Sequence, residues 1–286
     1  MSETPKLAGV IGWPITHSLS PLIHTLWAHR AGVNGYYIPV AAKPSYDEFA
    51  GVVGALKIAG FAGVNVTLPH KSNALQLADD ASEGAKKAGA ANMLTFHDDH
   101  VYADNSDIFG FAASLDEATG GAGNSPTKRN SALVLGAGGA ARGVILGLRE
   151  RGIESIAVAN RTRERADELV DDFQIKAVDW AKKEGILGSV DILVNTTSLG
   201  MSGQPPLEIS LEKLSQAAVV ADIVYTPLQT PLLAEAASKD HQTANGLSML
   251  MHQAVPGFQT WFGAPAKVDA ALRDELIRAL ERRNKE

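Results

Sequence analysis

The sequence predicts an α/β fold with two domains and a mostly parallel sheet in the N-terminal one. Three observations lead to this prediction. Short apolar runs alternate with longer helical patterns along most of the chain, which is typical of βαβ units. The length of 286 residues suits two domains of about 150 residues each. The last segment, 247–286, has the pattern of two helices, which would close the fold.

The N-terminal half contains the first set of alternating elements. Four short apolar runs predict strands, over 7–12, 36–40, 63–67 and 92–96. Two longer stretches between them have helical patterns and predict helices, over 20–32 and 45–60. Each helix ends at a glycine, Gly32 and Gly60, and glycine is the usual residue just beyond a helix C-terminus because it adopts a left-handed conformation.

The alternation restarts after the stretch 117–130, whose Gly, Ser and Pro content fits either a domain linker or a long surface loop. The expected strands are 131–138, 155–160, 190–197 and 218–224, and the expected helices are 139–152 and 163–173. The final helix has apolar residues four apart, at Val268, Leu272, Leu276 and Leu280. That spacing predicts an amphipathic helix with one buried face.

Composition and charge exclude several classes of protein. The formal net charge of −6 argues against nucleic-acid binding by bulk electrostatics. The chain has no Cys, which excludes disulfides, thiolate metal sites and a Cys nucleophile. No H-E-x-x-H pattern occurs, and we expect no metal site. We see neither a signal peptide nor an apolar run of about 18 residues, so we expect a cytoplasmic protein without a membrane span.

A glycine-rich turn follows the expected strand 131–138. Gly136, Gly138 and Ala141 have the spacing G-x-G-x-x-A. In dinucleotide-binding domains the first glycine permits a tight turn, the second lets the backbone approach a pyrophosphate, and the third small residue lets helix and strand pack closely. The turn lies between a strand and a helix, which is the context this motif requires. The alternative is an ordinary glycine-rich turn. We predict a Rossmann-type dinucleotide-binding domain.

The next strand ends in the sequence VANRTRER, which bears on the choice of cofactor. Proteins that bind NAD usually have an acidic residue at this position, which binds the ribose 2′-hydroxyl. Here the turn has Asn160, Arg161 and Thr162 and no acid, and the cations Arg163 and Arg165 follow at the start of the helix. Cations in a first helical turn are unfavourable, so a simple solvated helix start is the weaker interpretation. We predict that the turn binds the 2′-phosphate of NADP.

Polar side chains gather near the expected strand ends of the N-terminal half. Asn65 and Thr67 end one strand, and Lys71 follows at the start of a helix. In open α/β sheets ligands bind at the carboxyl ends of strands, and a polyhydroxylated substrate needs a paired donor or acceptor for each hydroxyl. Ser20 before Pro21 also fits a simple helix N-cap, which leaves Ser18 unexplained.

Two more candidates come from the end of this half. Asn92 begins the expected strand 92–96, and Asp107 lies where the next helix starts, so Asp107 also fits a helix cap. By contrast, His17, His24 and His29 have no spacing typical of metal ligands. We expect these histidines to be ordinary polar or core residues.

The chain resembles the shikimate dehydrogenase family over nearly its whole length. The signatures occur in order: GWPITHSLSP, NVTLPHK, GAANM, ADNSD, GAGGAARG, NRT, NTTSLGM, YTPLQTPLL and GLSMLMHQA. The resemblance implies reversible, NADP-dependent reduction of 3-dehydroshikimate to shikimate, in the pathway to aromatic amino acids through chorismate. It also implies two domains with the active site in a cleft. We expect 1–106 plus 247–286 to bind substrate and 107–246 to bind NADP.

The resemblance assigns site residues by matching motifs. The implied catalytic residues are Lys71 and Asp107, a coupled pair that shares a proton; the sequence leaves open which is the base. The implied substrate ligands are Ser18, Ser20, Asn65, Thr67, Asn92, Tyr225 and Gln253. The implied cofactor contacts are Gly136, Ala137, Gly138, Gly139, Ala140, Ala141, Asn160, Arg161, Thr162, Arg165, Thr197 and Gly246.

Some positions depart from the family pattern and leave alternatives open. Thr25 stands where the family usually has Asn, Asn92 is followed by Met93 rather than Thr, and the usual GDNTDG is here ADNSDI. A quinate/shikimate dehydrogenase, or a paralogue that acts on a modified shikimate, is therefore an alternative. A ligand-binding relative without turnover is another, although Lys71 and Asp107 are both present. We expect a monomer or homodimer.

Overall fold

The structure is a computed structural model that describes residues 4–121 and 129–283. The chain forms two compact units, Met1–Ser106 with Gln253–Glu286 and Asp107–His252, which we call the first unit and the second unit. It passes between them inside two helices, α5 (Ser106–Thr119) and α9 (Gly246–Phe262). Half of the stretch expected as a linker or loop, residues 122–128, lies outside the described residues.

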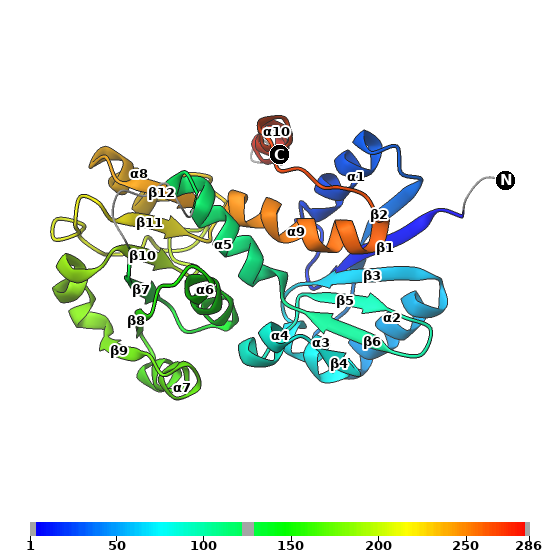
Figure 1. Cartoon of the computed structure of the whole chain (residues 1–286), viewed down its shortest axis with the longest axis horizontal. Coiled ribbons are helices and arrows are strands. Elements are labelled where there is room, and N and C mark those ends of the chain that lie inside the picture. Colours follow the sequence, from blue (N-terminus) through cyan, green and yellow to red (C-terminus); the bar gives the residue numbers. More distant parts are fainter. Residues whose placement is uncertain (1–3, 122–128, 284–286) are drawn as a thin grey trace. The chain divides into compact units, whose positions relative to one another are not determined.

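The first unit contains a sheet with the strand order β2-β1-β3-β5-β6-β4 (Figure 1). Its strands are β1 (Lys6–Gly12), β2 (Gly35–Ala41), β3 (Phe61–Val66), β4 (Asp80–Ala81), β5 (Met93–Phe96) and β6 (Val101–Asp104). Strand β1 pairs in parallel with β2 and β3, whereas β5 runs antiparallel to β3 and β6. Only residues 97–100 join β5 to β6, which is too short for the crossover that a parallel pair requires.

The helices of the first unit include the predicted ones and one, α4, that was not predicted. They are α1 (Ser20–Arg30), α2 (Tyr46–Ile58), α3 (Lys71–Leu77), α4 (Glu83–Ala88) and α10 (Ala270–Arg283). Gly32 and Gly60 follow the ends of α1 and α2 with φ of +64° and +82°, so their predicted role in ending these helices is confirmed.

The closing helix α10 begins later than its apolar spacing predicts. The Asp269 carboxylate accepts a hydrogen bond from the Leu272 backbone N–H at 2.9 Å. This contact caps the helix at Asp269, so Val268 lies before the first turn. Leu272, Leu276 and Leu280 are buried as expected.

The core of the first unit also includes residues from the end of the chain. The indole N–H of Trp261 donates to the Thr95 hydroxyl at 3.2 Å. Gly63 on β3 permits this approach, because a Cβ atom there would lie 2.1 Å from the indole nitrogen. Residues 253–283 are therefore part of this unit's packing and not an appendage to it.

The second unit contains a fully parallel sheet with the strand order β12-β11-β10-β7-β8-β9. Its strands are β7 (Ser131–Leu135), β8 (Ser155–Asn160), β9 (Lys176–Asp179), β10 (Ile192–Asn195), β11 (Val219–Asp222) and β12 (Gln242–Asn245). The strand order reverses between β7 and β10. Ligands of such sheets bind at this reversal, beyond the carboxyl ends of the strands.

Helices connect the strands of this sheet (Figure 1). Besides α5 and α9, they are α6 (Gly139–Glu150), α7 (Arg163–Phe173), the 3₁₀-helix η1 (Trp180–Ser189) and α8 (Pro231–Ser238). The predicted two-domain α/β fold with a Rossmann-type sheet is thus confirmed. Over the described ranges, no helix has the length and apolar character needed to cross a membrane.

Candidate active site

Three amide side chains of the first unit form one hydrogen-bonded cluster, although they come from distant parts of the sequence. The Asn65 Nδ2 group at the end of β3 donates to the Asn92 carbonyl oxygen at 3.2 Å. The Asn92 Nδ2 group donates to Gln253 Oε1 at 3.5 Å. All three side chains are buried. The structure therefore brings together Asn65, Asn92 and Gln253, which we call the amide cluster.

Ser106 fixes the orientation of the central amide. Its backbone N–H and its hydroxyl donate to Asn92 Oδ1 at 2.7 and 3.2 Å. The Ser106 hydroxyl also lies 3.5 Å from Gln253 Oε1. Because a backbone N–H only donates, the end of the Asn92 amide that faces Ser106 must be its carbonyl oxygen.

Thr67 follows β3 and is held there by the backbone. Its N–H donates to the Ile11 carbonyl oxygen at 2.9 Å. The neighbouring position 12 must be glycine, because a Cβ atom there would lie 2.4 Å from the Thr67 methyl group. Gly12 thus makes room for Thr67 at the end of the sheet.

Ser20 is not the N-cap that its position before Pro21 predicts. Helix α1 begins at Ser20 itself, and the capping position is taken by Leu19. The Ser18 hydroxyl accepts a hydrogen bond from the Ser20 backbone N–H at 3.3 Å. Ser18 therefore satisfies a free N–H at the helix start, and the buried Ser20 hydroxyl bonds to Tyr37 instead.

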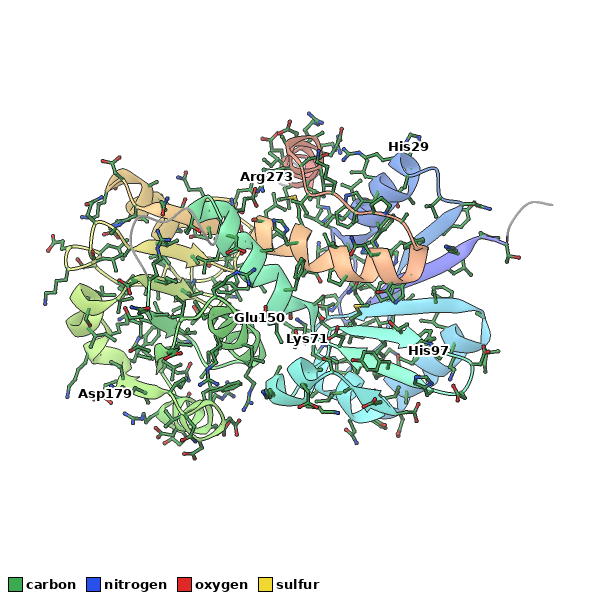
Figure 2. All side chains as sticks on the ribbon, viewed as in Figure 1. His29, Lys71, His97, Glu150, Asp179 and Arg273 are labelled. Atoms are coloured by element: carbon green, nitrogen blue, oxygen red, sulfur yellow. The ribbon has the colours of Figure 1, made fainter. Side chains whose placement is uncertain are left out.

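The two predicted catalytic residues lie at helix starts. Lys71 is the first residue of α3 (Figure 2), and its carbonyl oxygen accepts a hydrogen bond from the Ala91 N–H at 2.8 Å. That contact brings the start of α3 beside the residue preceding Asn92. Asp107 lies in the first turn of α5 but does not cap it, since the helix already begins at Ser106. The two residues belong to different units, so their pairing stays a prediction.

The glycine turn of the second unit has the geometry that the motif predicts. Gly136 has φ of +105°, and a Cβ atom there would lie 2.7 Å from Thr196 Oγ1. At Gly138 and Gly139, by contrast, a Cβ atom would meet nothing within 4 Å. Gly136 is therefore required by the fold, whereas the other two glycines keep the space at the start of α6 open. Ala141 is fully buried, as close packing of helix and strand requires.

The arginines in and after the turn that follows β8 differ in their contacts. Arg163 pairs with Asp167 at 2.8 Å and with Asp179, labelled in Figure 2, at 3.1 Å. Arg161 and Arg165 are exposed and have no ion pair within the part of the chain that the structure describes. The Asn160 Nδ2 group donates to the Thr162 carbonyl oxygen at 2.7 Å, which holds the turn.

A buried carboxylate organises the loops at the ends of β10 and β11. Asp222 Oδ1 accepts hydrogen bonds from Asn195 Nδ2 at 3.1 Å and from the Val224 N–H at 3.0 Å. Its Oδ2 atom accepts one from the Thr230 hydroxyl at 2.7 Å. Burial raises the pKa of Asp222 above its ordinary value, and these hydrogen bonds only partly oppose the rise.

The same network reaches two predicted site residues. Asn195 Oδ1 accepts hydrogen bonds from the Thr197 N–H and hydroxyl at 3.0 and 2.7 Å. Tyr225 follows Val224, whose N–H bonds to Asp222.

At Gly246 a Cβ atom would lie 2.2 Å from the Ile223 carbonyl oxygen. The requirement for glycine there is therefore explained by packing.

Sequence reasoning missed several residues that hold these groups in place, among them Tyr37, Asn195 and Asp222. Tyr37 looks like an ordinary strand residue, and Asn195 and Asp222 end apolar strands. Only their position at carboxyl ends of strands could have singled out the last two. His24, expected as an ordinary polar or core residue, is fully buried, and burial lowers its pKa to about 3.

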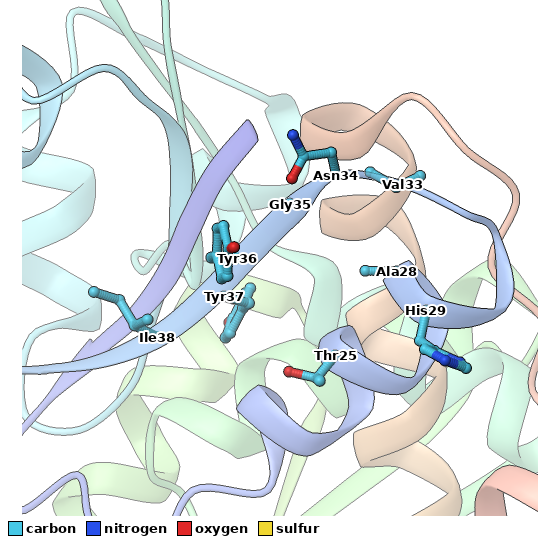
Figure 3. A pocket seen from close by; sticks show the side chains of 9 residues that line it. All are labelled: Thr25, Ala28, His29, Val33, Asn34, Gly35, Tyr36, Tyr37 and Ile38. Carbon is cyan, nitrogen blue, oxygen red and sulfur yellow. The ribbon is translucent and has the colours of Figure 1, made fainter. Parts of the chain in front are cut away.

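A shallow depression lies between α1 and β2 in the first unit (Figure 3). Its lining includes Thr25, His29 and Tyr36, and no predicted ligand of substrate or cofactor.

Among the described residues, no group of three or more His, Asp or Glu side chains is arranged to hold a metal ion.

Comparisons with known proteins agree with the resemblance read from the motifs. Residues 10–94 match the family model described as shikimate dehydrogenase substrate binding domain, and residues 122–202 match that of shikimate / quinate 5-dehydrogenase. The NADP(+) shikimate dehydrogenase of Dinoroseobacter shibae is 48% identical over 270 residues, which cover 93% of this chain and 95% of that protein.

Two solved structures also resemble this chain. The shikimate 5-dehydrogenase of Thermus thermophilus, in complex with NADP(H) and shikimate, has a TM-score of 0.83 at 34% identity and covers 96% of this chain and 99% of its own. The quinate dehydrogenase of Corynebacterium glutamicum, in complex with NAD, has a TM-score of 0.87 at 28% identity and covers 96% and 99%. From the identity and coverage of these relatives, the chain belongs to the shikimate dehydrogenase family.

Proposed function

We propose that this protein catalyses the reversible, NADP-dependent reduction of 3-dehydroshikimate to shikimate, in the route to chorismate and the aromatic amino acids. Relatives that match nearly the whole chain are shikimate dehydrogenases that use NADP(+). The observation that carries the proposal for the site is the amide cluster. Three buried amides at one strand end can pair with the hydroxyl groups of a small polyhydroxylated substrate.

The residues of the second unit fit NADP. The open space at Gly138 and Gly139 allows a pyrophosphate to approach the backbone at the start of α6. Arg161 and Arg165 are the cations proposed to bind the 2′-phosphate, since Arg163 is already paired with carboxylates. The proposal also includes Ala137, Ala140, Asn160, Thr162, Thr197 and Gly246 as neighbours of the cofactor.

Lys71 and Asp107 are the proposed catalytic residues. When bound, the cofactor supplies the hydride that reduces the ketone carbon of the substrate. The carbonyl oxygen then needs a proton, which the Lys71 ammonium donates. In the reverse direction the neutral amine accepts the hydroxyl proton. Asp107 is proposed to share that proton with Lys71, and Ser18, Ser20, Thr67 and Tyr225 are proposed to bind the substrate with the amide cluster.

No observation favours the alternative substrates over shikimate. The quinate dehydrogenase that this chain resembles is less similar in sequence than the NADP(+) shikimate dehydrogenases. A cytoplasmic location, a monomeric or dimeric state and the absence of nucleic-acid partners stay predictions from the sequence.

One assay tests the proposed function. Purified protein is mixed with shikimate and NADP⁺, and the absorbance of the reduced nicotinamide is followed over time. The same protein is then assayed with quinate and with NAD⁺. We expect the highest kcat/KM with shikimate and NADP⁺. Absence of turnover with shikimate, or a higher kcat/KM with quinate, would contradict the proposal.

A further inference from the structure

The phenol of Tyr37 lies among the proposed substrate ligands. Its side chain is 5% exposed. The Tyr37 hydroxyl donates to Asn65 Oδ1 at 2.7 Å and also forms a hydrogen bond with the Ser20 side chain. One buried hydroxyl therefore connects two residues that are proposed to contact the substrate, one at the start of α1 and one at the end of β3.

The direction of these hydrogen bonds follows from their chemistry. The Asn92 backbone carbonyl oxygen can only accept, so the Asn65 group that faces it must be Nδ2. Asn65 Oδ1 then faces Tyr37, which must donate its O–H. The amide is thus held in one orientation at both ends. It keeps a second N–H, which can donate to an oxygen atom of a ligand.

A neighbouring ring holds the phenol in place. The rings of His24 and Tyr37 are stacked, with their centroids 3.8 Å apart and their planes 10° from parallel. His24 is fully buried, and burial lowers its pKa to about 3, so its ring is neutral at physiological pH. A neutral, tightly packed ring restricts rotation of Tyr37 without adding a charge next to the substrate ligands.

We propose that Tyr37 is a positioning residue of the substrate site. Its hydroxyl fixes the Asn65 amide so that this side chain presents an N–H donor to a hydroxyl oxygen of the substrate. This inference rests on the proposed function, since it concerns the same site. Without the phenol hydroxyl the amide loses one of its two anchors, and an orientation that presents the carbonyl oxygen to the substrate becomes accessible.

The variant Tyr37→Phe tests this role, with Tyr36→Phe as the matched control. Both changes remove one hydroxyl from adjacent residues of β2, but Tyr36 is 61% exposed. We expect Tyr37→Phe to raise the KM for shikimate about tenfold, the effect of losing about 1.4 kcal/mol. The KM for NADP⁺ should stay unchanged, and kcat should change less than the KM for shikimate. Tyr36→Phe should match the wild type.

A double-mutant cycle separates positioning from a general loss of stability. If Tyr37 acts through Asn65, Tyr37→Phe should have little further effect on the KM for shikimate in an Asn65→Ala background. An equal loss in both backgrounds, or an unchanged KM for shikimate in the single variant, would overturn the inference. Failure of the wild type to oxidise shikimate would instead overturn the proposed function.

Discussion

The carboxyl ends of the parallel strands present different chemistry in the two units. In the first unit the candidate groups are side chains: the amide cluster is buried and its members are hydrogen-bonded to one another. In the second unit the glycine turn presents backbone at Gly138 and Gly139, and exposed guanidinium groups lie at the next turn. Both arrangements follow the rule that ligands bind beyond the ends of parallel strands.

This difference fits two kinds of ligand. A small molecule with several hydroxyls is distinguished by donors and acceptors whose orientation is fixed, as the contacts of Asn65 and Asn92 provide. A phosphate-bearing cofactor is bound by backbone N–H groups and by positive charge, which demand less of any single side chain. Substitutions at Lys71 and in the amide cluster should therefore affect turnover and substrate, and those in the glycine turn and in the turn after β8 should affect the cofactor.

Lys71→Ala is the strongest test of this division. Loss of a general acid–base residue lowers kcat by about 10²- to 10⁴-fold, and we expect the KM for NADP⁺ to stay nearly unchanged. Steady-state kinetics with shikimate and NADP⁺ measure both constants. Lys87→Ala is the control, because Lys87 is an exposed lysine of α4 in the same unit. Turnover close to that of the wild type would remove Lys71 from the chemistry.

The double substitution of Arg161 and Arg165 with Ala tests the cofactor side. Hydrogen bonds to charged groups contribute about 1.5–3 kcal/mol each, so we expect the KM for NADP⁺ to rise at least about tenfold. The KM for NAD⁺, which lacks the 2′-phosphate, should change little.

Arg163→Ala is the matched control for these arginines. Its guanidinium is already paired with Asp167 and Asp179, so the preference between NADP⁺ and NAD⁺ should be retained. If Arg163→Ala reduced that preference as much as the double substitution, charge alone rather than the position of the arginines would explain cofactor choice.

Two carboxylates of the second unit differ in the effect of burial on their pKa. Asp191, before β10, and Asp222, at the end of β11, each accept three hydrogen bonds. Burial would raise the pKa of Asp191, yet its bonds from Asn130 and Ser131 lower it. At Asp222, burial prevails and the pKa is raised. The balance between burial and hydrogen bonding therefore differs between the amino end of β10 and the carboxyl end of its neighbour β11.

These opposite directions predict opposite effects of pH on stability. The stabilising contribution of Asp222 is complete below about pH 3.9, the unfolded value, and is lost as pH rises through its folded pKa. That of Asp191 is present above about pH 3.9 and is lost as pH falls through its folded pKa. Relative to the wild type, Asp222→Asn should gain stability as pH rises from about 3 to 7, and Asp191→Asn should lose it.

Thermal unfolding at several pH values measures this effect. We expect a change in Tm of about 2–4 °C for Asp222→Asn, the size that about 1 kcal/mol produces in proteins of about 150–250 residues. The change for Asp191→Asn should be smaller, because water screens this more exposed carboxylate. A Tm difference from the wild type that moves in the same direction for both variants would contradict the role assigned to burial at Asp222.

Local features of the fold could be predicted from the sequence. The predictions for Gly32, Gly60 and Gly136 were correct, because a backbone with positive φ favours a residue without a Cβ atom, which the sequence shows directly. The glycine turn was recognisable because its strand and helix are adjacent in the chain. The β5–β6 hairpin was missed because β6 was not predicted as a strand: its four residues are too few to show a clear alternation of apolar and polar side chains.

The contacts within the candidate site could not be predicted in the same way. Tyr37 bonds to a residue 28 positions away, and Asn92 bonds to one 161 positions away. Such pairs depend on strand order and register, which local patterns do not specify. Ser20 illustrates the converse error: the local pattern predicted a cap, but a nearby hydroxyl, that of Ser18, already satisfied the backbone.

The path of the chain through the units has a consequence for synthesis on the ribosome. The second unit is one continuous piece, Asp107–His252, whereas the first needs both Met1–Ser106 and Gln253–Glu286. Trp261 must reach the space beside Gly63 before the first core is complete. The segment Met1–Ser106 is therefore synthesised before the second unit but completes its core after it. A chain truncated after His252 should contain a folded second unit and an incomplete first one.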